Sequence, residues 1–220
     1  GAFDPIGDLC SRARKAGAWV HIDGAFGLWA ACSARTRHLV QGMEQADSFS
    51  VDAHKTLNVP YDCGIVLCRH SEDLTQAMQL SGDYIQYSDS RDSMMYVPEM
   101  SRRNRATELW ATMKHLGRDG IEALVDTLCD GAGFFAQSLE AQGFTILNQV
   151  VFNQVLVACD TEAQTLGVLE RIQQGEDCWC SGSTWKGEPA IRVSVCSWAT
   201  TREDIVRSAA AFARARDQQT

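Results

Sequence analysis

Two ionisable residues stand at the ends of short apolar segments. Asp23 ends the segment AWVHID (18–23), and Lys55 follows the segment SFSVD (48–52) by three positions. Both segments are rich in β-forming residues, which is typical of buried strands. In open parallel sheets, ligands bind outside the carboxyl ends of the strands, so we expect the two side chains to point into one crevice.

Taken singly, neither residue indicates a site. An aspartate at a strand end often caps the segment after it, and a loop lysine is usually solvated. Together, Asp23 and Lys55 meet the requirements of pyridoxal phosphate, which needs a lysine to hold it as a Schiff base and an acid to keep its pyridine nitrogen protonated. A strand-end crevice also desolvates a lysine enough for its amine to attack an aldehyde.

The segments around these residues predict an α/β layer. Asp4 and Pro5 form an expected helix start, and apolar residues then recur at helical spacing until Gly17. The segment CGIVLCR (63–69) indicates a third strand, and strands separated by helical stretches favour parallel pairs. The polar stretch 70–100 lacks a clear period, so we expect a long loop that is functional or disordered.

The chain changes character near residue 100, where we place a domain boundary. Apolar residues between 106 and 116 share one helical face, and a second helix begins with a capping-box pattern at Asp119 and Glu122 and ends before Gly143. The remaining pattern predicts a small α+β unit with two strands, a helix from Thr161, a hairpin around residues 186–188 and a last helix that starts near Thr200 with Glu203 as its capping partner.

Composition restricts the class of protein. The chain has 220 residues, of which 45% are hydrophobic and 22% charged, a balance typical of a globular domain. The net charge of -8 argues against a nucleic-acid surface, since binding to phosphates requires a basic field. No apolar run approaches the roughly 20 residues of a membrane span, and the first residues do not resemble a signal peptide. We therefore expect no nucleic-acid or membrane partner.

The nine cysteines are irregularly spaced, which favours buried, reduced thiols in a cytoplasmic protein over a disulfide scaffold. Cys178 and Cys180 are the close pair, but the spacing is C-x-C and no second pair accompanies it. We therefore predict no zinc or other metal site.

Around Asp23 and Lys55, the segments HIDGAFG and SVDAHKTLNVPYDCG resemble the group II pyridoxal-phosphate amino-acid decarboxylases, the family of aromatic-L-amino-acid, histidine, diaminobutyrate and glutamate decarboxylases. The resemblance extends over the whole chain, including RRNRATELW and IRVSVCSWATT. It implies an α/β fold of the fold-type-I transferase class, with a mainly parallel sheet and flanking helices. Residues 1–100 would be the C-terminal part of the large cofactor-binding domain, and residues 101–220 the small α+β C-terminal domain.

The resemblance also implies roles for single residues. Lys55 would hold the cofactor covalently, and Asp23 would pair with its pyridinium nitrogen. Ala25 matches the small residue that packs beside the cofactor ring, and His54 matches a histidine close to the phosphate and the Schiff base. Asp52 stands where relatives often have asparagine.

A mobile loop in the family carries a tyrosine that donates a proton to the substrate carbon after carbon dioxide leaves. Tyr84 in LSGDYIQ is the best match, and Tyr87 and Tyr96 are competitors. Arg102 or Arg105, in the arginine-rich segment, would take part in the site or in subunit contacts, or form a plain salt bridge at a helix start.

The implied function is decarboxylation of an L-amino acid by a cytoplasmic homodimer with its site near the subunit interface. Subunits of the family are longer than this chain, and their ring-stacking histidine and phosphate loop are expected upstream of Gly1, so we expect a fragment of the full enzyme. Two alternatives stay open: another fold-type-I reaction, such as transamination or a carbon–carbon or carbon–sulfur lyase step, and a catalytically incomplete dimerisation module.

Overall fold

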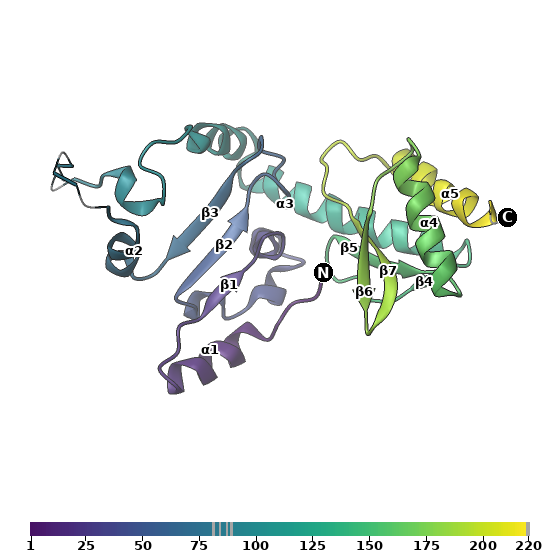
Figure 1. Ribbon diagram of the computed structural model, residues 1–220, viewed down its shortest axis with the longest axis horizontal. Helices are drawn as coiled ribbons and strands as arrows, with labels where there is room; N and C mark the ends of the chain where they lie inside the picture. Colours follow the sequence, from purple (N-terminus) through teal and green to yellow (C-terminus); the bar gives the residue numbers. More distant parts are fainter. Residues whose placement is uncertain (81, 84, 87, 89, 219–220) are drawn as a thin grey trace.

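The computed structural model describes residues 1–80, 82, 83, 85, 86, 88 and 90–218. Figure 1 shows two lobes joined by a long helix, α3 (Arg105–Glu140). The first lobe contains one sheet with α1 (Ile6–Lys15) and α2 (Ser71–Met78), and the second contains another sheet with α4 (Glu162–Gln174) and α5 (Arg202–Asp217).

In the described part of the chain, the first sheet has three strands in the order β1 (His21–Asp23), β2 (Ser48–Asp52) and β3 (Gly64–Cys68). β1 and β2 are parallel, which confirms the expected parallel pairing for these two strands. β3 departs from that expectation and runs antiparallel to β2. The connection, residues 53–63, is too short for the crossover that a parallel neighbour needs. We call residues 53–63, which include Lys55, the lysine loop.

The second sheet is antiparallel and has the order β4-β5-β7-β6 among the described residues. Lys186 and Gly187 join β6 to β7 with positive φ angles of 52° and 94°, which confirms the expected hairpin. Helices α4 and α5 pack against each other, and α4 also packs against β7. The bounds of the strands are β4 (Thr145–Ile146), β5 (Gln154–Ala158), β6 (Ser181–Trp185) and β7 (Glu188–Ser194).

Helix α3 combines the two helices expected on either side of residue 117. Gly117 interrupts it with non-helical angles of φ 63° and ψ -171°, a conformation that glycine adopts without a Cβ clash. Beyond this bend, Ile121 belongs to the hydrophobic core of the first lobe, and Phe135 and Leu139 belong to that of the second. One helix therefore contributes to both cores. The domain boundary expected near residue 100 stays a prediction.

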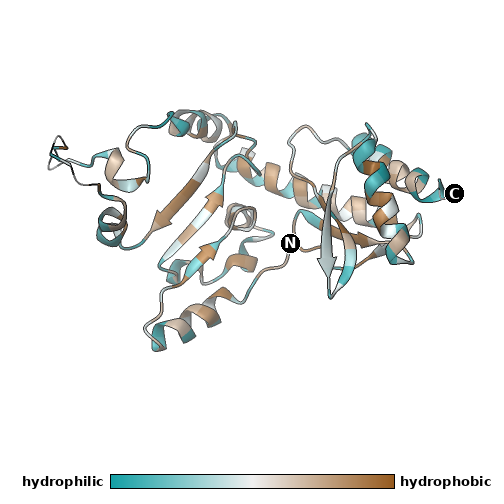
Figure 2. Cartoon of the chain, in the orientation of Figure 1, coloured by the Kyte–Doolittle hydropathy of each residue, from teal (hydrophilic) through white to brown (hydrophobic). Residues whose placement is uncertain are grey.

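Short 3-10 helices and exposed apolar strand residues complete the first lobe. Figure 2 shows that β3 is hydrophobic, yet Val66 and Leu67 on this strand are exposed. The 3-10 helices are η1 (Gly27–Cys32), η2 (Arg37–Val40), η3 (Met43–Gln45) and η4 (Ser93–Tyr96).

In the described part of the chain, no helix is both long and apolar enough to cross a membrane.

Two helices begin one residue later than expected. In α1, Pro5 is the N-cap and Ile6 the first helical residue, rather than Asp4 and Pro5. In α5, Thr201 is the N-cap: its Oγ1 accepts a hydrogen bond from the Asp204 amide at 3.2 Å, and Asp204 Oδ2 accepts one from the Thr201 amide at 3.0 Å. The capping box is therefore formed by Thr201 and Asp204, and the predicted pair, Thr200 and Glu203, was wrong by one position.

This capping box predicts a specific stability difference. Thr201→Ala should lower the free energy of unfolding by about 1 kcal/mol, because the amide of Asp204 loses its acceptor at the start of α5. The neighbouring change Thr200→Ala is the matched control and should lower it by clearly less. Denaturant titration of both variants measures the difference, and equal losses would contradict the cap assignment.

Candidate active site

The turn after β1 fixes Asp23. Asp23 lies opposite Ser50 in the parallel ladder, and the Gly24 amide donates to the Ser50 carbonyl at 3.0 Å. The Asp52 amide donates to the Ala25 carbonyl at 3.1 Å, and the Ala25 amide donates to Asp23 Oδ1 at 3.3 Å. These bonds continue the β1–β2 pairing beyond the strand end. The backbone that carries the Asp23 carboxylate is therefore hydrogen-bonded to β2.

The lysine loop reverses the direction of the chain after β2. The amides of Ala53 and His54 both donate to the Cys63 carbonyl, at 2.9 and 3.3 Å. Lys55 Nζ lies 2.8 Å from Asp52 Oδ2 and 5.1 Å from the centre of the Phe26 ring. The Lys55 side chain is 30% exposed. A carboxylate and an aromatic face therefore hold its amine in one place while leaving it accessible.

The structure brings Asp23 and Lys55 to the same cavity, as their positions at strand ends predict. This cavity has a volume of about 520 Å³, within the range of small-molecule sites. Both lobes line it, the first with Asp23, Ala25, Phe26 and Lys55 and the second with Asn153 and Arg192. The roles of Asp23, Ala25 and Lys55 toward a cofactor stay predictions.

His54 contacts the end of the lysine loop and the carboxylate of Asp52. Its Nδ1 accepts a hydrogen bond from the Cys63 amide at 3.2 Å, and its ring lies 4.1 Å from that of Tyr61, between centroids. His54 Nε2 is 3.6 Å from Asp52 Oδ2, the oxygen that also binds Lys55. His54 is absent from the described residues that line the cavity. Its role near a phosphate stays a prediction.

The tyrosines of the long segment stay predictions as well. Tyr84 and Tyr87 lie outside the described residues. Tyr96 is the last residue of η4, and the guanidinium of Arg91 lies 4.5 Å from the centre of its ring.

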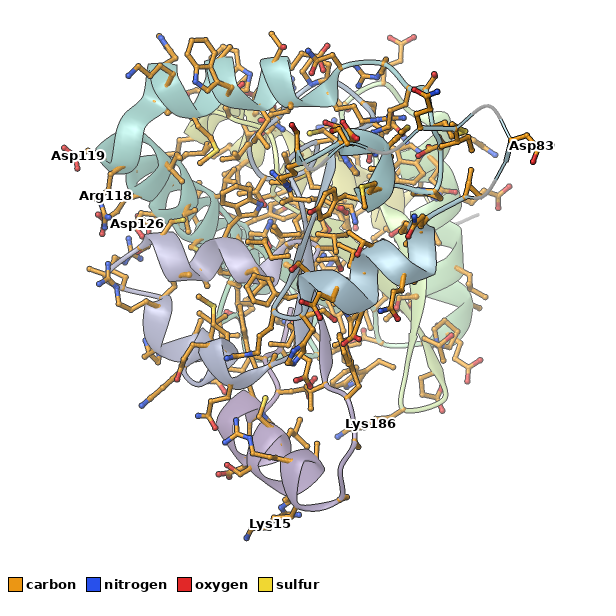
Figure 3. All side chains as sticks on the ribbon, turned by 90° about the vertical axis from the view of Figure 1, so that its left-hand side faces the viewer. Lys15, Asp83, Arg118, Asp119, Asp126 and Lys186 are labelled. Carbon is orange, nitrogen blue, oxygen red and sulfur yellow. The ribbon has the colours of Figure 1, made fainter. Side chains whose placement is uncertain are left out.

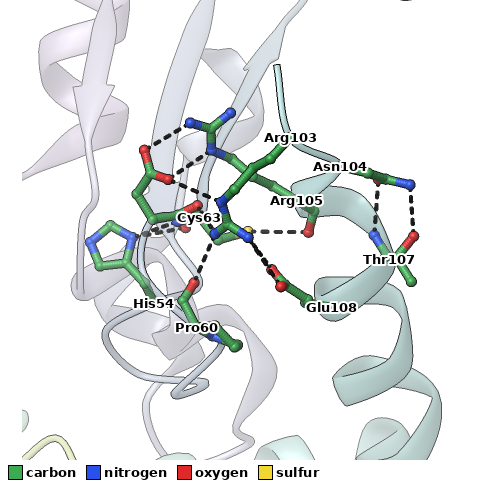
Figure 4. A network of polar contacts seen from close by, with 9 residues as sticks. His54, Pro60, Cys63, Arg103, Asn104, Arg105, Thr107 and Glu108 are labelled. Carbon is green, nitrogen blue, oxygen red and sulfur yellow. Dashed lines mark hydrogen bonds and ion pairs between the residues drawn. The ribbon is translucent and has the colours of Figure 1, made fainter.

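The arginine-rich segment binds the lysine loop from the start of α3. Arg105 donates two hydrogen bonds to the carboxylate of Asp62, at 2.9 and 3.0 Å. Arg103 donates to the Asp62 carbonyl at 2.9 Å and to Glu108 Oε2 at 2.9 Å (Figure 4). Arg102 lies 3.9 Å from Glu99 instead. The segment thus forms salt bridges at the start of α3, and those of Arg105 hold the end of the loop that bears Lys55.

Sequence analysis overlooked three residues near the site: Phe26, Asn58 and Arg192. Phe26 lies beside the Lys55 amine, and Arg192 enters the cavity from β7. Asn58 adopts a positive φ of 51° and bonds to both lobes. One signal was visible for Arg192, a charged residue within the apolar string AIRVSV. The partners of Asn58 lie far away in the sequence.

The chain is similar to known decarboxylases. Residues 1–158 match the family model described as the pyridoxal-dependent decarboxylase conserved domain. The chain belongs to this family. Tyrosine/DOPA decarboxylase 1 of Papaver somniferum is 37% identical over 121 residues, 53% of this chain and 23% of that protein. Histidine decarboxylase of Mus musculus is 28% identical over 215 residues, 94% of this chain and 32% of that protein.

Solved structures of the decarboxylase class confirm the fold. The crystal structure of Oryza sativa TDC with PLP and tryptamine superposes with a TM-score of 0.88 at 22% identity. The match covers 99% of this chain and 48% of that one. The chain therefore has a partial fold-type-I architecture, and it spans about a quarter to a third of the curated relatives.

The Asp62–Arg105 pair predicts acid sensitivity. Hydrogen bonds from Arg105 lower the pKa of Asp62 from 3.8 to about 2. A lowered pKa in the folded state means that the pair stabilises the fold fully above pH 3.8 and ceases to do so as the pH falls through 2. Asp62→Asn should therefore lower the melting temperature at neutral pH, and its difference from the wild type should vanish between about pH 4 and pH 2.

Thermal unfolding at several pH values measures this effect. Asp119, which projects from the bend of α3 in Figure 3, supplies the matched control Asp119→Asn. A difference between wild type and Asp62→Asn that persists unchanged at pH 2 would contradict the role of the Asp62 carboxylate.

Proposed function

We propose that this chain is part of a pyridoxal-phosphate-dependent carboxy-lyase that converts an L-amino acid to its amine and carbon dioxide. One observation carries the proposal: Lys55 and Asp23, in a chain of the pyridoxal-dependent decarboxylase family, line one cavity. The names of curated relatives include tyrosine, histidine and aspartate decarboxylases. The proposal therefore names an L-amino acid as the substrate and does not specify its side chain.

The residues present fit pyridoxal 5'-phosphate. The accessible amine of Lys55 would hold the aldehyde carbon covalently, and the carboxylate of Asp23, fixed by the turn after β1, would pair with the pyridine nitrogen. Ala25 lines the same cavity, and its small side chain would pack beside the ring. His54 does not line that cavity, and its place near the phosphate rests on the family resemblance alone. When bound, the cofactor withdraws electrons from the carbon that loses carbon dioxide.

The chain's own groups would orient the substrate and control its protons. Asp52 forms a salt bridge with Lys55 Nζ and so holds this amine beside the cavity. Asp23 would keep a proton on the pyridine nitrogen. The guanidinium of Arg192 would bind the substrate carboxylate, because its paired N–H donors match the two oxygens of a carboxylate. Tyr84 would donate the proton to the carbon, with Tyr87 and Tyr96 as the alternatives.

We also propose the expected organisation of the whole protein. Residues 1–100 would complete a large cofactor-binding domain and residues 101–220 would form the small C-terminal domain. The protein would be a cytoplasmic homodimer with its site near the subunit interface. Arg192 and Asn153 support a site between domains, since they reach the Asp23 cavity from the second lobe.

Product analysis separates this function from its alternatives. The full-length protein, incubated with pyridoxal phosphate and single L-amino acids, should release carbon dioxide and amine in equal amounts. Formation of a keto acid would instead indicate transamination. Failure of the full-length protein to acquire the cofactor would indicate a dimerisation module.

Lys55→Ala should abolish the visible absorbance of the lysine-bound cofactor and its trapping by borohydride, because no other lysine among the described residues lines the cavity. Lys15→Ala is the control: Figure 3 shows Lys15 projecting from the end of α1, and this variant should keep both signals. A wild-type band in the full-length Lys55→Ala protein would reject the assignment.

Asp23→Asn should keep the covalent attachment through Lys55 but lower kcat by about 100-fold or more, because an amide does not hold a proton on the pyridine nitrogen as a carboxylate does. The exposed Asp8 on α1 provides the control Asp8→Asn, which should leave kcat unchanged. Wild-type turnover in Asp23→Asn would remove Asp23 from the site.

A further inference from the structure

Asn58 occupies the middle of the lysine loop in an unusual backbone conformation. Its φ angle of 51° lies in the left-handed region, which asparagine tolerates better than most residues. Its amide donates to the Lys55 carbonyl at 3.2 Å, and its side-chain Nδ2 donates to the same carbonyl at 2.8 Å. The carbonyl of Lys55 therefore receives two hydrogen bonds from one residue.

The other contacts of Asn58 reach the second lobe. Nδ2 also donates to the Cys196 carbonyl at 2.9 Å, and Oδ1 accepts a hydrogen bond from the Trp198 amide at 2.7 Å. These partners follow β7, the strand that carries Arg192 to the cavity. Both ends of the half-buried side-chain amide are thus occupied, and they join the backbone of Lys55 to the segment after β7.

Cys196 also lies within electrostatic reach of Lys55. Burial raises the pKa of the Cys196 thiol, and the positive charge of Lys55 partly offsets that rise. The segment that Asn58 binds therefore interacts electrostatically with the charge of Lys55 as well as with its backbone through Asn58.

The rest of the lysine loop is fastened without Asn58. The amides of Ala53 and His54 bind Cys63, and Arg105 binds Asp62 at the far end of the loop (Figure 4). Removing the side chain of Asn58 would therefore leave the loop in place and keep the bond from the Asn58 amide to the Lys55 carbonyl, but would remove the second bond to that carbonyl and the link to the second lobe.

We infer that Asn58 is a positioning residue for Lys55: through its side-chain amide it holds the backbone of the reactive lysine against the segment after β7, and so sets where the lysine amine meets the cavity. This inference rests on the proposed function, because the proposed function makes the amine of Lys55 the reactive group. Misplacement of a reacting group by about 1 Å can lower a rate by about 100-fold, which is the scale of effect at issue.

Asn58→Gly tests the inference, because glycine keeps the positive φ without strain and removes only the side-chain bonds. Lys186→Gly is the matched control, since Lys186 has a φ of 52° in the β6–β7 turn. Asn58→Asp is the second variant: it keeps the shape and the acceptor for the Trp198 amide, but loses the two donors to the carbonyls of Lys55 and Cys196.

The full-length protein without cofactor is mixed with pyridoxal phosphate, and the growth of the lysine-bound absorbance is followed in time. Asn58→Gly and Asn58→Asp should capture the cofactor about 10-fold more slowly and lower kcat by about 10-fold or more, with KM changed less than about 2-fold. Lys186→Gly should match the wild type in both measurements.

The outcomes separate this inference from the proposed function. A wild-type protein that forms no lysine-bound band overturns the proposed function and with it the role of Asn58. A wild-type protein that forms the band, together with a folded Asn58→Gly or Asn58→Asp variant that captures the cofactor and turns over normally, overturns only the role of Asn58. A lower melting temperature with unchanged capture would assign Asn58 to stability alone and would also overturn it.

Discussion

The parallel pairing of β1 with β2 is the constraint on which the site depends. Ile22 lies opposite Phe49 and Asp23 opposite Ser50, so both strands end at the same edge of the sheet. The hydrogen bonds from Gly24 to Ser50 and from Asp52 to Ala25 continue the pairing by two residues. A slip of one residue would turn the Asp23 side chain to the opposite face of the sheet. The backbone hydrogen bonds of β1 and β2 therefore fix the strand ends that carry Asp23 and lead to Lys55.

The lysine loop adds rigidity where the chain leaves the sheet. It is held at its base by the bonds to Cys63, at its far end by Arg103 and Arg105, and in its middle by Asn58. The bonds to Cys63 lie within the loop, and the other anchors come from the start of α3 and from the segment after β7. A loop held by its own bonds and by two other parts of the chain loses its freedom during folding, before any ligand binds, so ligand binding does not have to supply that entropy.

Local patterns predicted much of this arrangement. Asp23 and Lys55 were found because apolar strand residues precede both, and the β6–β7 hairpin was found because Gly187 suits a turn with positive φ. The antiparallel direction of β3 follows from the length of the lysine loop, a signal that was present and was not used. The starts of α1 and α5 were each missed by one residue, since neighbouring polar residues compete for the cap and only the geometry decides.

Other features depend on contacts that no local pattern records. Asn58 is 138 residues from Cys196 in the sequence, and its side chain links the lobes by donating a hydrogen bond to the Cys196 carbonyl. Arg192 shares a cavity with Asp23 because the two lobes meet there. The sequence carries the residue types for such contacts but not the distances between them, so these residues became visible only in the folded chain.

Helix α3 explains why the two lobes can build one cavity. Ile121 and Val125 pack in the core of the first lobe, and about three turns later Phe135 and Leu139 pack in the core of the second. The segment of α3 after the bend is buried in both cores, so it cannot move relative to either without exposing apolar surface, which costs roughly 25 cal/mol for each Å². The lobes are therefore held at a fixed separation, and Arg192 on β7 and Asp23 on β1 are kept at the same cavity. The hydrophobic contacts of α3 thus control the polar geometry of the site at a distance from it.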